Sequence, residues 1–210
     1  MIKIFLADDH QLFREGIKQI LSNSKEIKVV GEAGNGREVL ERVINCHPDV
    51  LALDISMPGM NIFDLLNEIK KLYRELPILI LSMHPEEQYA FRLLKAGIAG
   101  YLTKESAAEE LVTAIRKVNS GGKYINPKLA ETLAVAIEAN GETTPHILLS
   151  NREFEVMCML ASGKSLKEIA ESLYISQKTV TTYRARILEK LKLKNNVELT
   201  RYVIENKLIN

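Results

Sequence analysis

Three carboxylates in the first half of this sequence have the spacing of a cation-binding site. Asp8 and Asp9 directly follow an apolar, strand-like run, and Asp54 is the last residue of another such run. In a doubly wound sheet, ligand sites form at the carboxyl ends of neighbouring strands, so these carboxylates would converge if the first and third strands are neighbours. Close carboxylates repel one another unless a divalent cation neutralises them, and a site with only oxygen ligands favours a hard ion such as Mg²⁺.

Asp54 beside such an ion could attack phosphorus and become an acyl phosphate. The charge that develops on the phosphoryl oxygens needs a cation and a hydrogen-bond donor, for which Lys104 and Ser82 are candidates at the ends of two further runs. Each residue also has an ordinary alternative: Asp8 and Asp9 could cap a helix, Asp54 could belong to a turn, and Lys104 could lie on the surface. Because all of them fall at carboxyl ends of strands, we favour the joint chemical interpretation.

The elements that must position these residues alternate between short apolar runs and stretches of helical periodicity. Strands are expected at 2–7, 28–33, 49–54, 77–82 and 100–103. Two of these runs are apolar on both faces, as buried parallel strands require. Five strand–helix units within about 120 residues predict an α/β fold with a doubly wound, five-stranded parallel sheet.

A helix at 104–120 should complete this first domain. It would begin with a capping box of Ser106 and Glu109 and end before Gly121. A further helix is expected at 127–139, followed by a stretch with the composition of a linker.

From Leu149 onward the pattern is entirely helical. Three serines are placed to cap helices, two of them in capping boxes with a glutamate three residues later: Ser150 with Glu153, Ser165 with Glu168, and Ser176. Helices are expected near 151–162, 166–173, 177–191 and 196–206. A short helix, a tight turn and a longer basic helix predict a helix-turn-helix within an all-α, four-helix domain.

Positive charge gathers in this second domain. The whole chain has a formal net charge of only +1, but residues 146–210 carry 11 Lys or Arg against 7 Asp or Glu. A small basic domain behind a neutral one favours a polyanion as its partner, whereas a solvated helix face is the ordinary alternative.

Cysteine usage and the first residues bear on location. Cys46 and Cys158 lack metal-ligand spacing and are expected to be free thiols in a reducing compartment. We find neither a signal-peptide pattern nor an apolar run of the roughly 20 residues that span a bilayer. We therefore expect a cytoplasmic protein with no membrane partner.

The helix expected at 177–191 has two distinct faces. Val180, Ile187 and Leu191 form a buried stripe, whereas the opposite face is small and polar, with Lys178, Thr181, Thr182 and Ala185. That face could enter a major groove, where threonine can hydrogen-bond to bases or touch a thymine methyl group. Three cations could hold phosphates: Arg184, Arg186 and Lys190. An ordinary solvated face stays open as the alternative.

Four segments of the first domain resemble the signature blocks of response-regulator receiver domains, in the same order and spacing. They are Ala7–His10 (ADDH), Leu53–Gly59 (LDISMPG), Leu81–His84 (LSMH) and Ala96–Lys104 (AGIAGYLTK). The resemblance covers residues 1–122 and implies the CheY/flavodoxin-like fold.

The resemblance also assigns roles to these residues. It implies that Asp54 accepts a phosphoryl group from the phosphohistidine of a sensor histidine kinase. It implies that Asp9, Asp54 and the Ser56 carbonyl coordinate Mg²⁺, with Asp8 contributing through water. Two residues would bind the phosphoryl oxygens and one would be the aromatic switch: Ser82, Lys104 and Tyr101. Many receivers have proline after the lysine, with a cis peptide bond, whereas Glu105 stands here.

Residues 147–210 resemble the LuxR-type helix-turn-helix. The segments that carry this likeness are Leu149–Val156 (LSNREFEV), Gly163–Ser165 (GKS), Lys167–Ala170 (KEIA), Ile175–Ser176 (IS) and Lys178–Val180 (KTV). Joined to a receiver, they are typical of the NarL/FixJ subfamily, and Lys178–Arg184 (KTVTTYR) is closest to its GacA/BvgA-like branch. The chain departs from the wider pattern at Leu166, Thr181 and Tyr183.

The second resemblance implies a double-stranded DNA partner and a homodimer on DNA, paired through the last helix. The expected DNA-binding residues are Lys178, Thr179, Thr181, Thr182, Tyr183, Arg184, Arg186 and Lys190. Residues 123–146 would form a linker that is helical in part, and RNA polymerase is a further candidate partner.

The leading hypothesis is a phosphorylation-switched transcription factor that is not an enzyme toward other molecules, because a receiver catalyses only its own phosphotransfer and self-dephosphorylation. Two alternatives remain open. One is a Mg²⁺ phosphatase with an aspartyl nucleophile, although Ser56 stands where a second aspartate would be expected. The other is an adaptor whose helical domain binds protein.

Overall fold

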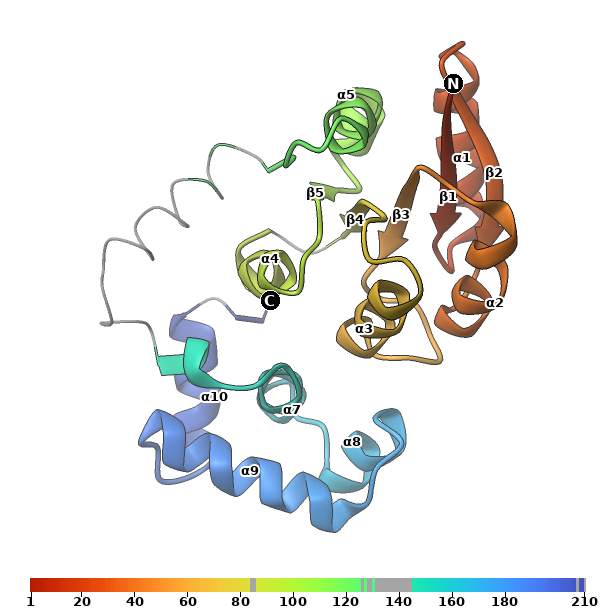
Figure 1. Cartoon of the computed structure of the whole chain (residues 1–210). Coiled ribbons are helices and arrows are strands. Elements are labelled where there is room, and N and C mark those ends of the chain that lie inside the picture. The colour runs from red at the N-terminus through yellow and green to blue at the C-terminus, as the bar shows by residue number, and fades with distance from the viewer. Residues whose placement is uncertain (84–85, 126, 128–129, 131–144, 207, 210) are drawn as a thin grey trace. The chain divides into compact units, whose positions relative to one another are not determined.

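The computed structural model describes residues 1–83, 86–125, 127, 130, 145–206 and 208–209, and it divides into two compact units, Met1–Glu131 and Thr132–Asn210. His84, and most of the helix expected at 127–139, lie outside the described residues. We describe each unit by itself (Figure 1).

The first unit is the predicted α/β domain. Its five strands pair in parallel in the order β2-β1-β3-β4-β5, and they are β1 Ile2–Ala7, β2 Ile27–Ala33, β3 Val50–Asp54, β4 Ile78–Ser82 and β5 Gly100–Thr103. The helices are α1 Gln11–Ser22, α2 Gly36–Cys46, α3 Ile62–Leu72, α4 Glu86–Lys95 and α5 Ala107–Asn119. The predicted five-stranded, doubly wound sheet is therefore confirmed.

Helices cover both faces of this sheet. On one face α1 and α5 pack on the strands through a cluster that includes Ile17, Leu21, Leu111 and Ile115. Figure 1 shows α2, α3 and α4 together on the other face. Every residue of β3 and β4 is buried, as expected for the central strands of a sheet covered on both sides.

The strand register brings the carboxyl ends of four strands to one edge. Ala7 pairs with Leu53, and the last residue of β3, Asp54, pairs with Leu81. Ser82 pairs in turn with Thr103. The residues that follow β1, β3, β4 and β5 therefore meet at the same edge, where a doubly wound sheet forms its ligand site.

The capping box expected at the start of α5 is wrong. Ser106 has an α-helical backbone (φ −81°, ψ −11°), and its side chain makes no cap hydrogen bond within the described residues. In that conformation its hydroxyl instead donates to the Thr103 carbonyl oxygen at 3.2 Å. The other end is as predicted, because the helix stops at Asn119 and Gly121 has φ +84°.

The second unit is the predicted helical domain. It contains the 3₁₀ turn η1 Pro145–Leu148 and the helices α7 Asn151–Ala161, α8 Leu166–Ser172, α9 Gln177–Leu191 and α10 Asn196–Glu205. Both predicted capping boxes, at Ser150 and Ser165, are present, and Ser176 caps α9 by accepting a hydrogen bond from the Thr179 backbone. The turn between α8 and α9 places Tyr174 in the left-handed region (φ 53°), with 83% of the residue exposed.

A polar contact joins the two ends of this unit. His146 in η1 lies with its Nδ1 2.9 Å from the hydroxyl oxygen of Tyr202 in α10, and the two rings meet edge to face with centroids 5.9 Å apart. Burial raises the pKa of Tyr202, so the phenol stays protonated at neutral pH. Among the described helices of either unit, we find none long and apolar enough to span a bilayer.

Candidate functional site

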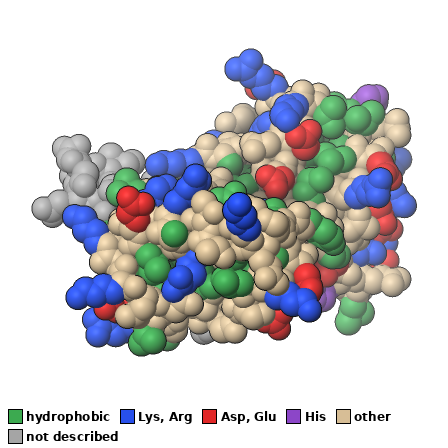
Figure 2. Space-filling model, turned by 90° about the horizontal axis from the view of Figure 1, so that it is seen from below, with side chains coloured by type: hydrophobic (Ala, Val, Ile, Leu, Met, Phe, Trp, Pro, Cys, Tyr) green, Lys and Arg blue, Asp and Glu red, His purple; other side chains and the backbone are tan. Residues whose placement is uncertain are grey.

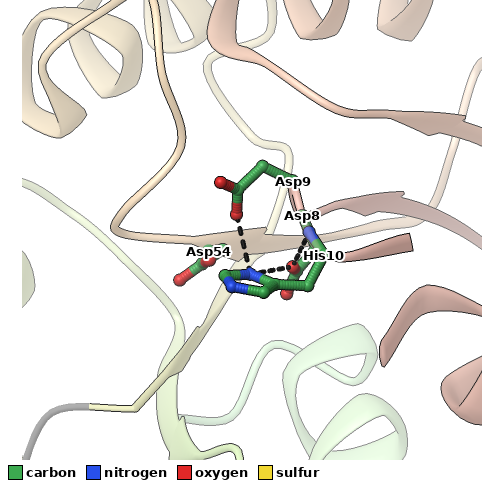
Figure 3. A group of neighbouring side chains, drawn as sticks. All are labelled: Asp8, Asp9, His10 and Asp54. Carbon is green, nitrogen blue, oxygen red and sulfur yellow. Dashed lines mark hydrogen bonds and ion pairs between the residues drawn. The ribbon is translucent and has the colours of Figure 1, made fainter. Parts of the chain in front are cut away.

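The carboxylates identified in the sequence meet at the carboxyl edge of the sheet. Asp8 and Asp9 leave β1, and Asp54 ends the neighbouring strand β3. One ligand atom from each of these residues, together with Nδ1 or Nε2 of His10, lies within 4.8 Å of all the others (Figure 3). Asp8 and Asp54 are buried, whereas the Asp9 side chain is 33% exposed, so the cluster opens toward solvent on the Asp9 side.

Lys104 extends from the end of β5 into this cluster. Its Nζ lies 2.6 Å from Asp8 Oδ2 and 2.9 Å from Asp54 Oδ2, and only 5% of its side chain is exposed. The contact with Asp54 is a hydrogen bond, whereas the contact with Asp8 is an ion pair without hydrogen-bond geometry. The ring of Phe13 covers the ammonium group on another side, with its centroid 4.7 Å away. A single lysine thus bridges two buried carboxylates.

Burial and ion pairing oppose each other in this bridge. Burial raises the pKa of Asp54, and the charge of Asp8 raises it further, against the opposing effect of Lys104. Burial lowers the pKa of Lys104, but its contacts with Asp8 and Asp54 outweigh burial and leave the pKa raised. The lysine therefore stays charged while the two carboxylates compete for it.

The donor set fits a hard divalent cation. Three carboxylates face one ammonium group, and the buried Asp8 Oδ2 accepts no hydrogen bond within the described residues. Asp54 Oδ1 accepts a hydrogen bond of 3.3 Å from the Ser56 backbone N–H, so the chain turns over this carboxylate just after β3. Negative charge in excess of positive charge, at oxygen ligands open on one side, is the arrangement that a partly hydrated Mg²⁺ requires.

The expected phosphoryl-binding residue Ser82 and the expected aromatic switch Tyr101 are both fully buried. Ser82 ends β4, and its carbonyl oxygen accepts a hydrogen bond of 2.8 Å from the Lys104 backbone N–H. Tyr101 lies in β5, paired with Ile80, and its ring occupies the inward position. The peptide bond between Lys104 and Glu105 is trans.

Two neighbours of the cluster were not found from the sequence. The Nδ1 atom of His10 lies 2.8 Å from Asp9 Oδ1 and 3.3 Å from Asp8 Oδ1. Arg14 donates to the Asp8 carbonyl oxygen from α1, and its Nε donates to Glu32 in β2 at 3.1 Å. The adjacency of His10 to two aspartates was a usable signal, whereas nothing in the spacing places Arg14 and Glu32 together.

The second candidate site is the polar face of α9, where four residues are exposed: Lys178, Thr181, Thr182 and Ala185. The threonine hydroxyls donate to backbone carbonyls of their own helix, at 2.9 Å to Gln177 and 3.0 Å to Lys178. Each hydroxyl oxygen therefore keeps its lone pairs as acceptors. Figure 2 looks at the molecule from the side where α9 lies in Figure 1, and it shows separate Lys and Arg side chains rather than one continuous basic patch.

Two of the cations expected to hold phosphates also make contacts inside the unit. Arg184 Nε donates to Asn196 Oδ1 in α10 at 2.6 Å. Lys190 Nζ donates to Glu153 Oε2 in α7 at 2.6 Å, and the Glu153 side chain is only 4% exposed. The remaining residues expected at DNA also lie on α9: Arg186 is exposed, whereas Thr179 and Tyr183 are half-buried.

Comparisons with known proteins agree with both sites. Residues 4–116 match the family model of the response regulator receiver domain, and residues 148–203 match that of the luxR family of bacterial regulatory proteins. The response regulator UvrY of Escherichia coli K12 is 39% identical over 211 residues, which cover 100% of this chain and 97% of UvrY. The response regulator GacA of Pseudomonas syringae is 35% identical, with 100% and 98% covered.

A solved structure is similar over nearly the same length. RcsB from Salmonella enterica serovar Typhimurium, bound to the promoter rprA in the presence of the phosphomimetic BeF₃⁻, superimposes with a TM-score of 0.72 and 26% sequence identity. The match covers 97% of this chain and 98% of RcsB.

Proposed function

The chain belongs to the response regulators of two-component systems, in the NarL/FixJ subfamily with a LuxR-type DNA-binding domain, and we propose that phosphorylation of Asp54 switches its binding to DNA. The observation that carries the proposal is the bridge of Lys104 between Asp8 and Asp54 at the joined strand ends. Such a bridge holds a nucleophilic carboxylate in a buried position next to the cation that its product needs.

In the proposed reaction, a carboxylate oxygen of Asp54 bonds to the phosphorus of a phosphohistidine on a sensor kinase. The bond between that phosphorus and the imidazole nitrogen breaks, and the histidine leaves with the electron pair. Lys104, already 2.9 Å from Asp54, then neutralises a phosphoryl oxygen, and the Ser82 hydroxyl donates to another. Hydrolysis of the acyl phosphate restores Asp54, so the only chemistry we propose is the regulator's own.

The proposed cofactor is Mg²⁺, held by Asp9, Asp54 and the Ser56 carbonyl, with Asp8 contributing through water. The ion would supply positive charge to the phosphoryl oxygens. Three observations support this set: the convergence of the carboxylates, the buried Asp8 oxygen without a hydrogen bond in the described residues, and the turn of the backbone at Ser56. Tyr101, on the strand that pairs with the strand of Ser82, would carry the change to the rest of the domain, since both residues are packed without exposure.

In the second domain, α9 would enter the major groove with its small polar face toward the bases. Thr181 and Thr182 would meet base edges as acceptors or through their methyl groups, and Arg186 would hold a phosphate. Two apolar residues on α10, Val197 and Ile204, are 79% and 59% exposed. They are seven residues apart and therefore lie on one side of the helix, which supports pairing of two copies through α10 on a two-fold operator. The proposal places this regulator in the cytoplasm, with RNA polymerase as a further partner.

The decisive experiment compares genomic DNA fragments retained with and without a small phosphodonor and Mg²⁺. We expect wild type to retain a specific set more tightly after phosphorylation, and Asp54→Asn to lose this stimulation. Asp64→Asn, an exposed aspartate on α3, is the matched control and should keep it. Unchanged stimulation in Asp54→Asn would refute the proposal. Turnover of an external phosphate ester far beyond one per chain would favour a phosphatase, and a lack of salt-sensitive retention would favour a protein adaptor.

A further inference from the structure

His10 brings a nitrogen donor to a site whose other donors are oxygens. Its Nδ1 points at Asp9 Oδ1 and Asp8 Oδ1, at 2.8 and 3.3 Å, and its backbone N–H donates to Asp8 Oδ1 at 2.8 Å (Figure 3). The backbone bond fixes the turn from β1 into α1, so the three consecutive side chains face the same space. Asp54 approaches that space from β3.

An imidazole nitrogen and two carboxylate oxygens that face one another need a hydrogen or a metal ion between them. The tautomer with its hydrogen on Nδ1 meets this need, and so does a metal ion bound to the nitrogen lone pair. Donor atoms that share one ion at about 2.1 Å lie roughly 3–4 Å from one another. The four donors here lie within 4.8 Å, so a small contraction suffices. The His10 side chain is 64% exposed and the Asp9 side chain 33% exposed, which leaves both free to make that movement.

The chemistry of this donor set differs from that of a Mg²⁺ site. Mg²⁺ prefers oxygen and gains little from imidazole, whereas divalent ions late in the first transition row bind imidazole strongly. We propose that His10, with Asp8, Asp9 and Asp54, forms a site for a divalent transition ion of the Zn²⁺ class, which competes with Mg²⁺ for the same carboxylates. The inference rests on the proposed function only in sharing those three residues.

The bound ion would have four protein ligands, the number that closes a zinc site. Its competition with Mg²⁺ makes the phosphorylation of Asp54 sensitive to the supply of such ions. His10 is then the residue that sets the preference between the two kinds of ion, while the carboxylates serve both.

The test is isothermal titration of the full chain with Zn²⁺ alone, with Mg²⁺ alone, and with Zn²⁺ at increasing Mg²⁺. The variants are His10→Ala and His10→Gln, both of which replace a side chain that is 64% exposed. The matched control is His47→Asn, because His47 is an exposed histidine outside the site, and asparagine tolerates its left-handed backbone (φ 43°).

We expect wild type to bind one Zn²⁺ at this site, and Mg²⁺ to weaken that binding in proportion to its concentration. Both His10 variants should lose at least about tenfold in Zn²⁺ affinity and keep Mg²⁺ affinity within about twofold, while His47→Asn should match wild type. Unchanged Zn²⁺ affinity in the His10 variants or an equal loss for both ions would overturn the inference, and so would, in a chain that binds Mg²⁺, Zn²⁺ binding that Mg²⁺ does not weaken. A wild-type chain that binds Zn²⁺ competently through His10 but never Mg²⁺ would instead refute the proposed cofactor and leave this site standing.

Discussion

Replacing Lys104 with methionine tests the central contact of the receiver domain. The ammonium group bridges Asp8 and Asp54, and all three side chains are at most 5% exposed. Methionine keeps most of the volume of the side chain and removes the charge. The two buried carboxylates would then face each other without a cation, and we expect the domain to lose stability at neutral pH.

The size of the loss follows from the geometry. At an effective dielectric constant of about 20, each ion pair of Lys104 is worth roughly 6 kcal/mol before the cost of burying the charges is subtracted. The variant can limit its loss by protonating one aspartate. Protonating a carboxyl group of ordinary pKa 3.8 at pH 7 costs about 4 kcal/mol, at 1.36 kcal/mol for each pH unit. We therefore expect Lys104→Met to destabilise the receiver by about 3–4 kcal/mol, in line with other broken buried pairs.

The sign of the pH dependence is also fixed. Burial raises the pKa of Asp54 above its ordinary value of 3.8. A carboxyl group whose pKa is raised in the folded state stabilises the fold at pH values below its ordinary pKa, and this contribution is lost as the pH rises through the folded pKa. The destabilisation of Lys104→Met should thus grow from acidic to neutral pH. Adding Asp54→Asn removes one of the competing charges and should restore most of the stability.

Hydrogen exchange followed by mass spectrometry suits this measurement, because peptides from β3 and β4 report the receiver separately from the second unit. Wild type, both single variants and the double variant would be compared at several pH values without Mg²⁺. Equal protection in Lys104→Met and wild type, or no recovery in the double variant, would refute the reasoning.

Three further predictions concern the second domain. Asn196→Ala should weaken DNA binding by about 1 kcal/mol only while Arg184 is present, so a double-mutant cycle by fluorescence anisotropy should show the coupling, and additive losses would contradict it. Burial raises the pKa of Glu153, but Lys190 and the capping box outweigh burial and leave the pKa lowered, so the stability of the domain should fall as the pH drops below 4.5 through the folded pKa. Lys190→Met should cost about 1–3 kcal/mol in a urea titration and flatten this pH dependence. An unchanged slope of stability against pH would count against this role of Lys190. Tyr174→Gly should raise the melting temperature, because a left-handed backbone costs residues other than glycine about 1–2 kcal/mol. The greater conformational entropy of glycine in the unfolded state offsets only part of that gain. A lower melting temperature would argue against strain at Tyr174.

The sheet was predictable from the sequence because its signals are local. Apolar runs and helical periodicity placed every strand within one residue of its observed start, and serine followed by glutamate located two helix starts. The same rule failed at Ser106, because its hydroxyl bonds backward to the Thr103 carbonyl oxygen at the end of β5 rather than forward to the helix. Convergence of Asp8 and Asp54 could be foreseen, since parallel strands share an edge.

Contacts between distant residues could not be foreseen in the same way. Lys104 was expected as a phosphoryl-binding cation, but its ion pair with Asp8 depends on how β5 lies relative to β1, two strands that are not neighbours. Lys190 and Glu153 are 37 residues apart, and each had a plausible local role. Spacing predicts which residues share a face of one element, whereas pairing across elements is fixed by side-chain length and packing.

The contact between His146 and Tyr202 makes the second domain a self-contained folding unit. Its two partners are 56 residues apart, one in the first turn of the domain and the other in its last helix. Because the two ends of the domain are held together by a contact within the domain, its fold does not depend on the tether that joins it to the receiver. Genetic recombination can therefore exchange the receiver of such a chain by one crossover in the tether. The helical DNA-binding domain then keeps its fold behind a different receiver.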